Sequence, residues 1–226
     1  MRATLLLRFA APMQSWGADS RFDIRRTNRE PTKSAAIGLV AAAMGRRRDE
    51  SVADLAGMKF GVRIDREGTL LRDFHIARKM KKNKPEEVEA SYVTHRYYLC
   101  DSVFLVGFES NDTSFLEQIE DAVKCPTFPL FLGRRSCPPE GRVCLGIREQ
   151  PLENALREEP PLVPNSGEMR ILMDVDGTVP GGAVANDLPI SFDPNKREHT
   201  SRHVQQIITY TDTTVETEHD PMAEWE

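Results

Sequence analysis

Two adjacent arginines, Arg134 and Arg135, follow a glycine in the segment "LGRRSC". Neighbouring side chains diverge at a tight turn, so one arginine can reach a phosphate while the other braces the loop. The planar guanidinium group suits bidentate hydrogen bonding to phosphate better than the lysine ammonium does. A plain β-turn does not require the pair, and we therefore expect both arginines to bind phosphate groups.

The segment "QSWG" joins polar and aromatic side chains just after the first predicted strand. Trp16 can stack on an unpaired base, which contributes about 1–3 kcal/mol in proteins that bind single strands. Gln14 and Ser15 can contact base edges or phosphates. The sequence leaves open the alternative that Trp16 packs into the core.

A small-residue helix, predicted within "PTKSAAIGLVAAAMG", begins with polar groups and follows two arginines, Arg25 and Arg26. The start of a helix carries about half a positive charge and free amide groups, where anions bind readily. Lys33 and the Ser34 hydroxyl lie in its first turn. We expect these four residues to bind phosphate as well.

Catalysis is the alternative chemistry that the sequence offers. His75 and His95 flank a charged segment and could meet across a hairpin, where one would act as general base and the other as general acid in metal-independent RNA cleavage. The four cysteines include no CxxC pair and have no histidine at ligand spacing, so neither a metal nor a cofactor is expected.

The net charge of −5 is unevenly distributed. Residues 1–50 carry a net +5, residues 51–150 are neutral, and residues 151–226 carry −10. This asymmetry predicts an anionic partner for the amino-terminal half and a basic protein neighbour for the acidic end. Arg8 interrupts the apolar start of the chain, which therefore resembles a strand more than a signal peptide, and we expect a cytoplasmic protein with no membrane contact.

The spacing of apolar residues predicts the elements that position these side chains. Strands are expected at Thr4–Phe9, 58–65, 69–77, 91–109, 142–147, 170–176 and 203–211, and helices within 31–45, 46–57 and 110–125. The strand at 58–65 alternates as if half-buried. Residues 14–31 have little periodicity and indicate a long loop, and residues 78–90 indicate a disordered loop or the tip of a protruding hairpin.

The order of elements in residues 1–150 matches an α+β, ferredoxin-like (RRM-like) βαββαβ sheet with its helices on one face. Residues 151–226 are interrupted by prolines and glycines, and we expect a small, irregular β-rich lobe with an acidic tail. This architecture is shared by RNA-binding domains and enzymes, so it does not by itself indicate a function.

Several segments, in the same order along the chain, closely resemble one family. These are "MRATLLLRFAAPMQSWG", "PTKSAAIGLVAAAMG", "LRDFHIA", "YYLCDSVFLV" and "PLFLGRRSCPPE". They resemble the CasD family, subunits of the type I-E CRISPR Cascade complex of antiviral defence. The combination of "PMQSWG" with "LGRRSCP" is the specific part, and the resemblance covers most of residues 1–150.

The resemblance implies a non-catalytic RNA-binding subunit with a ferredoxin-like palm and a β-hairpin thumb at about 75–97. It implies that the chain caps the 5′ handle of the CRISPR RNA and that the thumb helps to kink the guide. The implied partners are the backbone and large subunits of Cascade, and target DNA through the complex. The implied RNA contacts are Gln14, Ser15, Trp16, Arg25, Arg26, Lys33, Ser34, Arg134 and Arg135.

Overall fold

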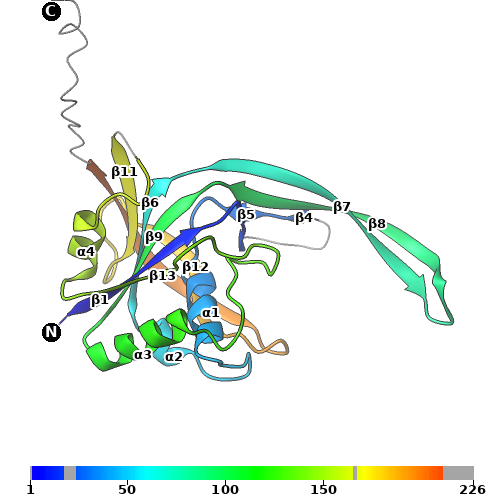
Figure 1. Cartoon of the computed structure of the whole chain (residues 1–226), viewed down its shortest axis with the longest axis horizontal. Helices are drawn as coiled ribbons and strands as arrows, with labels where there is room; N and C mark the ends of the chain where they lie inside the picture. Colours follow the sequence, from blue (N-terminus) through cyan, green and yellow to red (C-terminus); the bar gives the residue numbers. More distant parts are fainter. Residues whose placement is uncertain (1, 18–23, 165–166, 211–226) are drawn as a thin grey trace, which may run out of the picture.

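One seven-stranded antiparallel sheet organises the residues that the computed structural model describes, which are 2–17, 24–164 and 167–210 (Figure 1). The strand order is β10-β1-β9-β6-β11-β13-β12. The strands span β1 Ala3–Ala10, β6 Lys59–Arg66, β9 Val103–Ser110, β10 Cys144–Arg148, β11 Glu168–Asp174, β12 Ala183–Ser191 and β13 Glu198–Tyr210. With its helices, the sheet makes a strand-rich α+β protein.

Helices lie in two of the connections between the first four strands of that order. Helix α1 (Lys33–Ala43) and the short α2 (Ala53–Ala56) lie between β1 and β6, and α3 (Thr113–Lys124) lies between β9 and β10. The succession β, α, β, β, α, β predicted for residues 1–150 is present. This succession could be predicted because each of these elements has its own local spacing of apolar residues.

Side-chain caps begin the two longer helices. The Thr32 hydroxyl accepts a hydrogen bond from the Ala35 amide, and the Asp112 carboxylate accepts one from Phe115. Gly45 follows α1 with φ +77°, the left-handed conformation that ends many helices. Among the described residues, no helix is long and apolar enough to cross a membrane.

Both faces of the sheet are covered, because a helix beyond residue 150 adds to the single helical face predicted for residues 1–150. Helices α1, α2 and α3 pack on one face, and the fourth helix, α4 (Leu152–Glu158), packs on the other. Gly61 of β6 and Gly107 of β9 leave the space that Leu152 and Leu156 fill. The spacing of Leu152, Ala155 and Leu156 was a helical signal that the flanking prolines obscured.

The α4 helix also explains why β6 is not half-buried as predicted. The Arg63 side chain is fully buried, pairs with Asp65 at 2.7 Å, and donates to the carbonyl of Leu156 at 2.7 Å and to those of Glu159 and Pro160. These carbonyls lie at the end of α4, where a cation is favourable. The polar side chains of Arg63 and Asp65 in β6 therefore lie buried between the sheet and α4 instead of facing water.

Residues 168–210 extend the main sheet and do not form an appended lobe. Strand β11 pairs with β6, and β13 pairs with both β11 and β12. Sequence reasoning missed β12 because its pairing with β13 has irregular register between Ala185 and Leu188 and again between Pro189 and Ser191. A bulged strand loses the strict alternation by which strands are recognised.

A long β-hairpin projects from the body (Figure 1). It consists of β7 (Thr69–Lys81) and β8 (Lys84–Cys100), paired along their length. Two short strands lie along the outer edge of β8 at its base: β2 (Met13–Gln14) and β4 (Ile24–Arg25). Strands β3 (Trp16–Gly17) and β5 (Thr27–Asn28) pair with each other, so the predicted loop at 14–31 contains short strands in its described part.

A buried charge cluster ties α1 to the strands β11, β12 and β13. Lys33 Nζ donates to Asp174 at 2.8 Å and to the Met58 carbonyl at 2.7 Å. The Lys33 amide, at the start of α1, donates to the Asp187 carboxylate at 2.7 Å. Arg202 pairs with both aspartates. Burial lowers the pKa of Lys33, and Asp174 opposes that shift.

The turn that carries the arginine pair is fixed by a close backbone approach. The Ser15 amide donates to the Leu132 carbonyl at 3.2 Å. Gly133 has φ +86°, and a Cβ at this position would lie 1.7 Å from the Ser15 carbonyl oxygen. Only glycine fits this position. Arg134 is the next residue, so the contact fixes where its side chain leaves the backbone.

Replacing Lys33 by alanine should lower the free energy of unfolding by about 3 kcal/mol, because it removes one partner of a buried ion pair. Urea denaturation of the full chain measures this change. Ser34→Ala, in the same turn of α1, is the matched control and should change the free energy by less than about 0.5 kcal/mol. Equal effects of the two substitutions would contradict the structural role of Lys33.

Gly133→Ala should lower the free energy of unfolding by about 3 kcal/mol or more, because it adds a backbone clash to the cost of a positive φ. Gly177 has φ +78° but no atom within 4 Å of an added Cβ. Gly177→Ala is therefore the control and should cost about 1–2 kcal/mol. Thermal or urea unfolding that gives the same loss for both variants would rule out the contact with Ser15 as the reason.

Candidate nucleic-acid interface

Strand β4 runs parallel to β8 at the base of the hairpin. Ile24 lies beside His95, and Arg25 lies beside Arg96. Successive side chains of a strand point to opposite faces. Arg25 therefore shares the face of Arg96, whereas Arg26 lies toward the other face, where it lines a shallow pocket with Thr27, Leu70 and Tyr97.

Arg134 reaches the Arg25 side of the hairpin base from the turn after Gly133. Its Nη2 donates to the Arg25 carbonyl at 3.0 Å, and its guanidinium carbon lies 4.6 Å from the centre of the Tyr98 ring. Its Nη1 is buried and has no hydrogen-bond partner. Arg135 is exposed on the same turn. The structure thus brings Arg25 and Arg134 together, as a shared phosphate site requires.

Arg96 and Tyr98 belong to the same face of β8, and sequence reasoning did not select them. Arg96 Nε is buried without a hydrogen-bond partner. Burial tends to raise the pKa of the Tyr98 hydroxyl, but interactions with Arg134, Ser136 and Arg96 outweigh it, and the pKa is lowered. The alternation of "HRYYLC" was the available signal, since it places Arg96 and Tyr98 on one face of a strand.

Arginines predominate on this face, where the carboxylate of Asp73 lies opposite Arg96 on β7, 3.6 Å from His75 Nδ1. Among the described residues, no carboxylate forms an ion pair with Arg25, Arg96 or Arg134. Other arginines of the chain are paired, such as Arg46 with Asp54 and Arg63 with Asp65. A cluster of cations that the protein leaves unneutralised is favourable for binding a polyanion.

The opposite face of the hairpin base is more aromatic and apolar. From the pocket formed with Arg26, it continues along β7 and β8 through Phe74 and His95, whose rings lie 5.9 Å apart. Phe74 is 58% exposed. Exposed rings beside an arginine are the combination on which unpaired bases stack.

The three residues of "QSWG" that were expected to contact RNA, Gln14, Ser15 and Trp16, are buried, which corrects that expectation. Trp16 is 1% exposed and stacks on Phe9, with ring centres 5.6 Å apart. The Gln14 amide donates to the Ser102 carbonyl, and the Ser15 hydroxyl donates to the Tyr97 carbonyl. Trp16 packs against the apolar first strand because burial of an aromatic ring away from water is favourable.

Lys33 and Ser34 do not join the arginines. The Lys33 ammonium is occupied by Asp174, and the anion expected at the start of α1 is the protein's own Asp187 carboxylate. Ser34 is half-buried beside it. Both carboxylates lie more than 140 positions away in the chain, so no local pattern revealed them.

The two histidines considered for catalysis lie on opposite faces of the hairpin. His75 is opposite Thr94, and His95 is opposite Phe74. Their alternation on paired strands directs them away from a common phosphate. All four cysteines are free, and the described residues contain no group of side chains that could hold a metal ion.

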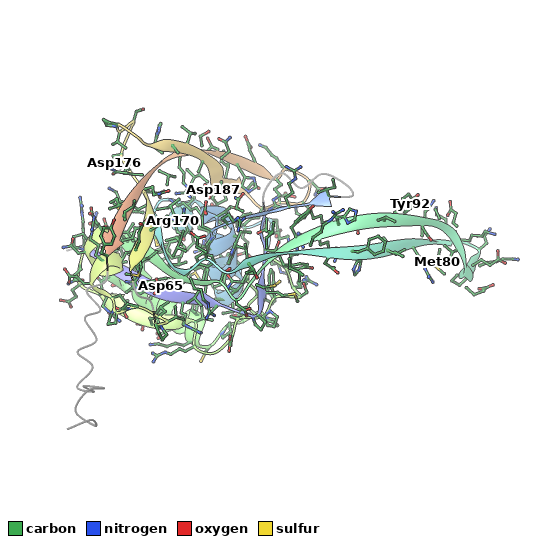
Figure 2. All side chains as sticks on the ribbon, turned by 90° about the horizontal axis from the view of Figure 1, so that it is seen from above. Asp65, Met80, Tyr92, Arg170, Asp176 and Asp187 are labelled. Atoms are coloured by element: carbon green, nitrogen blue, oxygen red, sulfur yellow. The ribbon has the colours of Figure 1, made fainter. Side chains whose placement is uncertain are left out.

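The charged segment predicted as a loop or hairpin tip is the tip of the β7–β8 hairpin, and it neutralises much of its own charge. Lys79 pairs with Glu89 at 2.6 Å, and Lys81 and Lys84 both pair with Glu87, at 2.6 and 2.8 Å. The tip projects well beyond the body, as the positions of Met80 and Tyr92 show (Figure 2). The tip is therefore less suited to bind a polyanion than the base of the hairpin.

Sequence comparison relates this chain to known proteins over most of its length. A family model described as "CRISPR-associated protein (Cas_Cas5)" matches residues 4–205. The CRISPR system Cascade subunit CasD of Escherichia coli (strain K12) is 34% identical over 176 residues, which are 71% of this chain and 79% of CasD.

Solved structures agree with the sequence comparison. A crystal structure of a Cas protein is 36% identical, with a TM-score of 0.72 over 91% of this chain and 94% of the other. A chain of a CRISPR RNA-guided surveillance complex is 30% identical, with a TM-score of 0.73 over 92% of this chain and 90% of the other. The family model spans most of the chain, including the hairpin base, and the chain therefore belongs to the Cas5 family of CRISPR-associated proteins.

Proposed function

We propose that this chain is a subunit of a Cascade-type surveillance complex in the cytoplasm, where it binds and caps the 5′ handle of the CRISPR RNA. One observation carries the RNA-binding part: Arg134 is fixed beside Arg25 and Tyr98 at the hairpin base, with no carboxylate to neutralise it among the described residues. The relation to CasD and to a surveillance complex supports the identity of the RNA.

The proposed RNA contacts differ from those expected from the sequence. Arg25, Arg26, Arg134 and the exposed Arg135 remain direct contacts in this proposal. The buried residues Gln14, Ser15 and Trp16 have a structural role in this proposal. Ser15 holds the turn at Leu132 through its amide and the backbone of Tyr97 through its hydroxyl. Lys33 and Ser34 belong to the structural cluster at the start of α1.

The architecture supports a ferredoxin-like palm with the β7–β8 hairpin as its thumb. The strand order β10-β1-β9-β6, with α1 and α3 as the two connections, has the arrangement of a βαββαβ unit. The hairpin enters between β6 and β9 of this unit. A palm of this kind would hold the RNA where the thumb leaves the sheet, which is where the arginines gather.

The outer part of the hairpin is proposed to contact the neighbouring backbone subunit and to help kink the guide. Ile76, Tyr92 and Val93 are 49%, 51% and 48% exposed. Apolar side chains at this density on a projecting hairpin favour a protein partner that covers them. The large subunit and the target DNA would be reached through the assembled complex.

No catalytic role is proposed, because His75 and His95, considered as general base and general acid for RNA cleavage, lie on opposite faces of the hairpin. General acid–base cleavage needs both groups beside one phosphate. Incubation of the purified chain with a hairpin of the CRISPR repeat, in the presence of EDTA, should leave the RNA intact on a denaturing gel. Specific cleavage that is lost in His75→Ala or His95→Ala would overturn this assignment.

Arg134→Ala should weaken binding of the chain to a labelled single-stranded RNA of the handle sequence about tenfold or more, because it removes a charge-assisted contact. The dependence of log Kd on log salt concentration should become shallower by about 0.7 for one lost phosphate contact. Fluorescence anisotropy at several salt concentrations measures both quantities.

Arg157→Ala is the matched control for that prediction. Arg157 lies on α4, at the end of the molecule opposite the hairpin, and its removal changes the net charge by the same amount (Figure 1). Its effect on Kd should be small. Equal weakening by the two substitutions would show that overall charge, and not the hairpin base, determines RNA binding.

A further inference from the structure

In the described part of the chain, Arg134 and Arg202 both stack on aromatic rings, but they are held differently. Arg202 lies 5.2 Å from the centre of the Phe60 ring and also pairs with Asp174 and Asp187. Arg134 lies 4.6 Å from the centre of the Tyr98 ring and has no carboxylate partner among the described residues. The two aspartates neutralise the charge of Arg202, whereas the charge of Arg134 is not neutralised by an ion pair.

A ring can orient a guanidinium group without neutralising it. The attraction between a cation and the face of an aromatic ring fixes the position of the cation, while its net charge stays available to a second partner. Tyr98 is 5% exposed, so its ring is held rigidly by its surroundings and is closed to a base. Its remaining neighbours on this face include Arg96, whose Nε has no partner.

We propose that Tyr98 is a positioning residue that holds Arg134 for the RNA, and that Arg96 is a further contact to the RNA backbone. Arg25, Arg96 and Arg134 then form one cradle on this face of β8. The inference rests on the proposed function and deepens it, because it assigns this face to the sugar–phosphate backbone and leaves base contacts to the face of Arg26 and Tyr97.

The backbone assignment follows from what the cradle contains. It presents the guanidinium groups of Arg25, Arg96 and Arg134 beside one carboxylate, that of Asp73, and the Tyr98 ring among them is buried. Guanidinium groups bind phosphate oxygens whatever the base sequence. The opposite face, in contrast, has an exposed ring at Phe74 and a pocket beside Tyr97. The lowered pKa of Tyr98 agrees with its position next to Arg134 and Arg96.

Binding measurements test the two parts of the proposal separately. Arg96→Ala should weaken binding of the full chain to the handle RNA and to an oligouridine of equal length by the same factor, about tenfold, and should reduce the salt dependence by about 0.7. A loss confined to the handle sequence would overturn the backbone assignment, and an unchanged Kd would remove Arg96 from the site.

A double-mutant cycle tests the positioning role. Tyr98→Leu removes the ring and should weaken RNA binding about fivefold to tenfold in the wild-type background. In the Arg134→Ala background the same substitution should have almost no effect, because the residue that Tyr98 holds is absent. Tyr210→Leu, at the exposed end of β13 in the main sheet, is the matched control. Equal losses in both backgrounds would overturn the positioning role.

A spectroscopic measurement keeps the test decisive if Tyr98→Leu fails to fold. The 13Cζ signals of labelled tyrosines report the pKa of each hydroxyl, and Tyr98→Phe identifies the Tyr98 signal. An alkali-stable 2′-O-methyl handle oligonucleotide should raise the pKa of Tyr98, because its phosphates neutralise the neighbouring arginines. A pKa that stays constant on saturation with the oligonucleotide would contradict the proposal.

The outcomes separate this inference from the function on which it rests. Binding that depends on Arg134 but not on Tyr98 or Arg96 would refute the cradle and leave the proposed function intact. No measurable binding of the handle RNA by the wild-type chain would refute both.

Discussion

The contact between Gly133 and Ser15 is the constraint on which the arrangement of the candidate site depends. It joins the turn before Arg134 to the segment that follows β1, at a separation where a single added carbon would overlap a carbonyl oxygen. The same segment is anchored to the end of β8 through the Ser15 hydroxyl. Three parts of the chain that are distant in sequence therefore meet at one backbone junction. The position of Arg134 follows from that junction, and the Tyr98 ring completes it.

The protein uses its charges in two opposite ways. Around Lys33 and Arg202 the charges are buried and matched by carboxylates, so they hold α1 against β11, β12 and β13. At the hairpin base the guanidinium groups of Arg25 and Arg134 remain unmatched within the described residues. Buried matched pairs contribute mainly to a unique arrangement of the fold, whereas unmatched cations create a field that attracts an anion. The net charge of the chain gives no indication of this division.

Sequence reasoning succeeded where the information was local and failed where it depended on distant partners. The longer strands and the helices of residues 1–150 were predicted because apolar spacing within each segment reports its own structure, whereas the two-residue strands within 13–28 were not. Arg25 and Arg134 were selected for their chemistry, and the fold brings them together. Lys33 was misassigned because its partner, Asp174, lies 141 positions away. Trp16 was ambiguous, since the same ring suits a base stack or a core, and only the surrounding side chains distinguish the two.

The free edges of the hairpin have a consequence for the time before assembly. Near its tip β8 pairs only with β7 among the described strands, so both outer edges present open amide and carbonyl groups beside exposed apolar side chains. Such edges are templates for sheets between separate chains. The lysines and glutamates of the tip, including Lys79, Lys81 and Glu87, surround them with charge. An unassembled subunit is thereby protected from self-association by the segment that contributes least to the basic cluster.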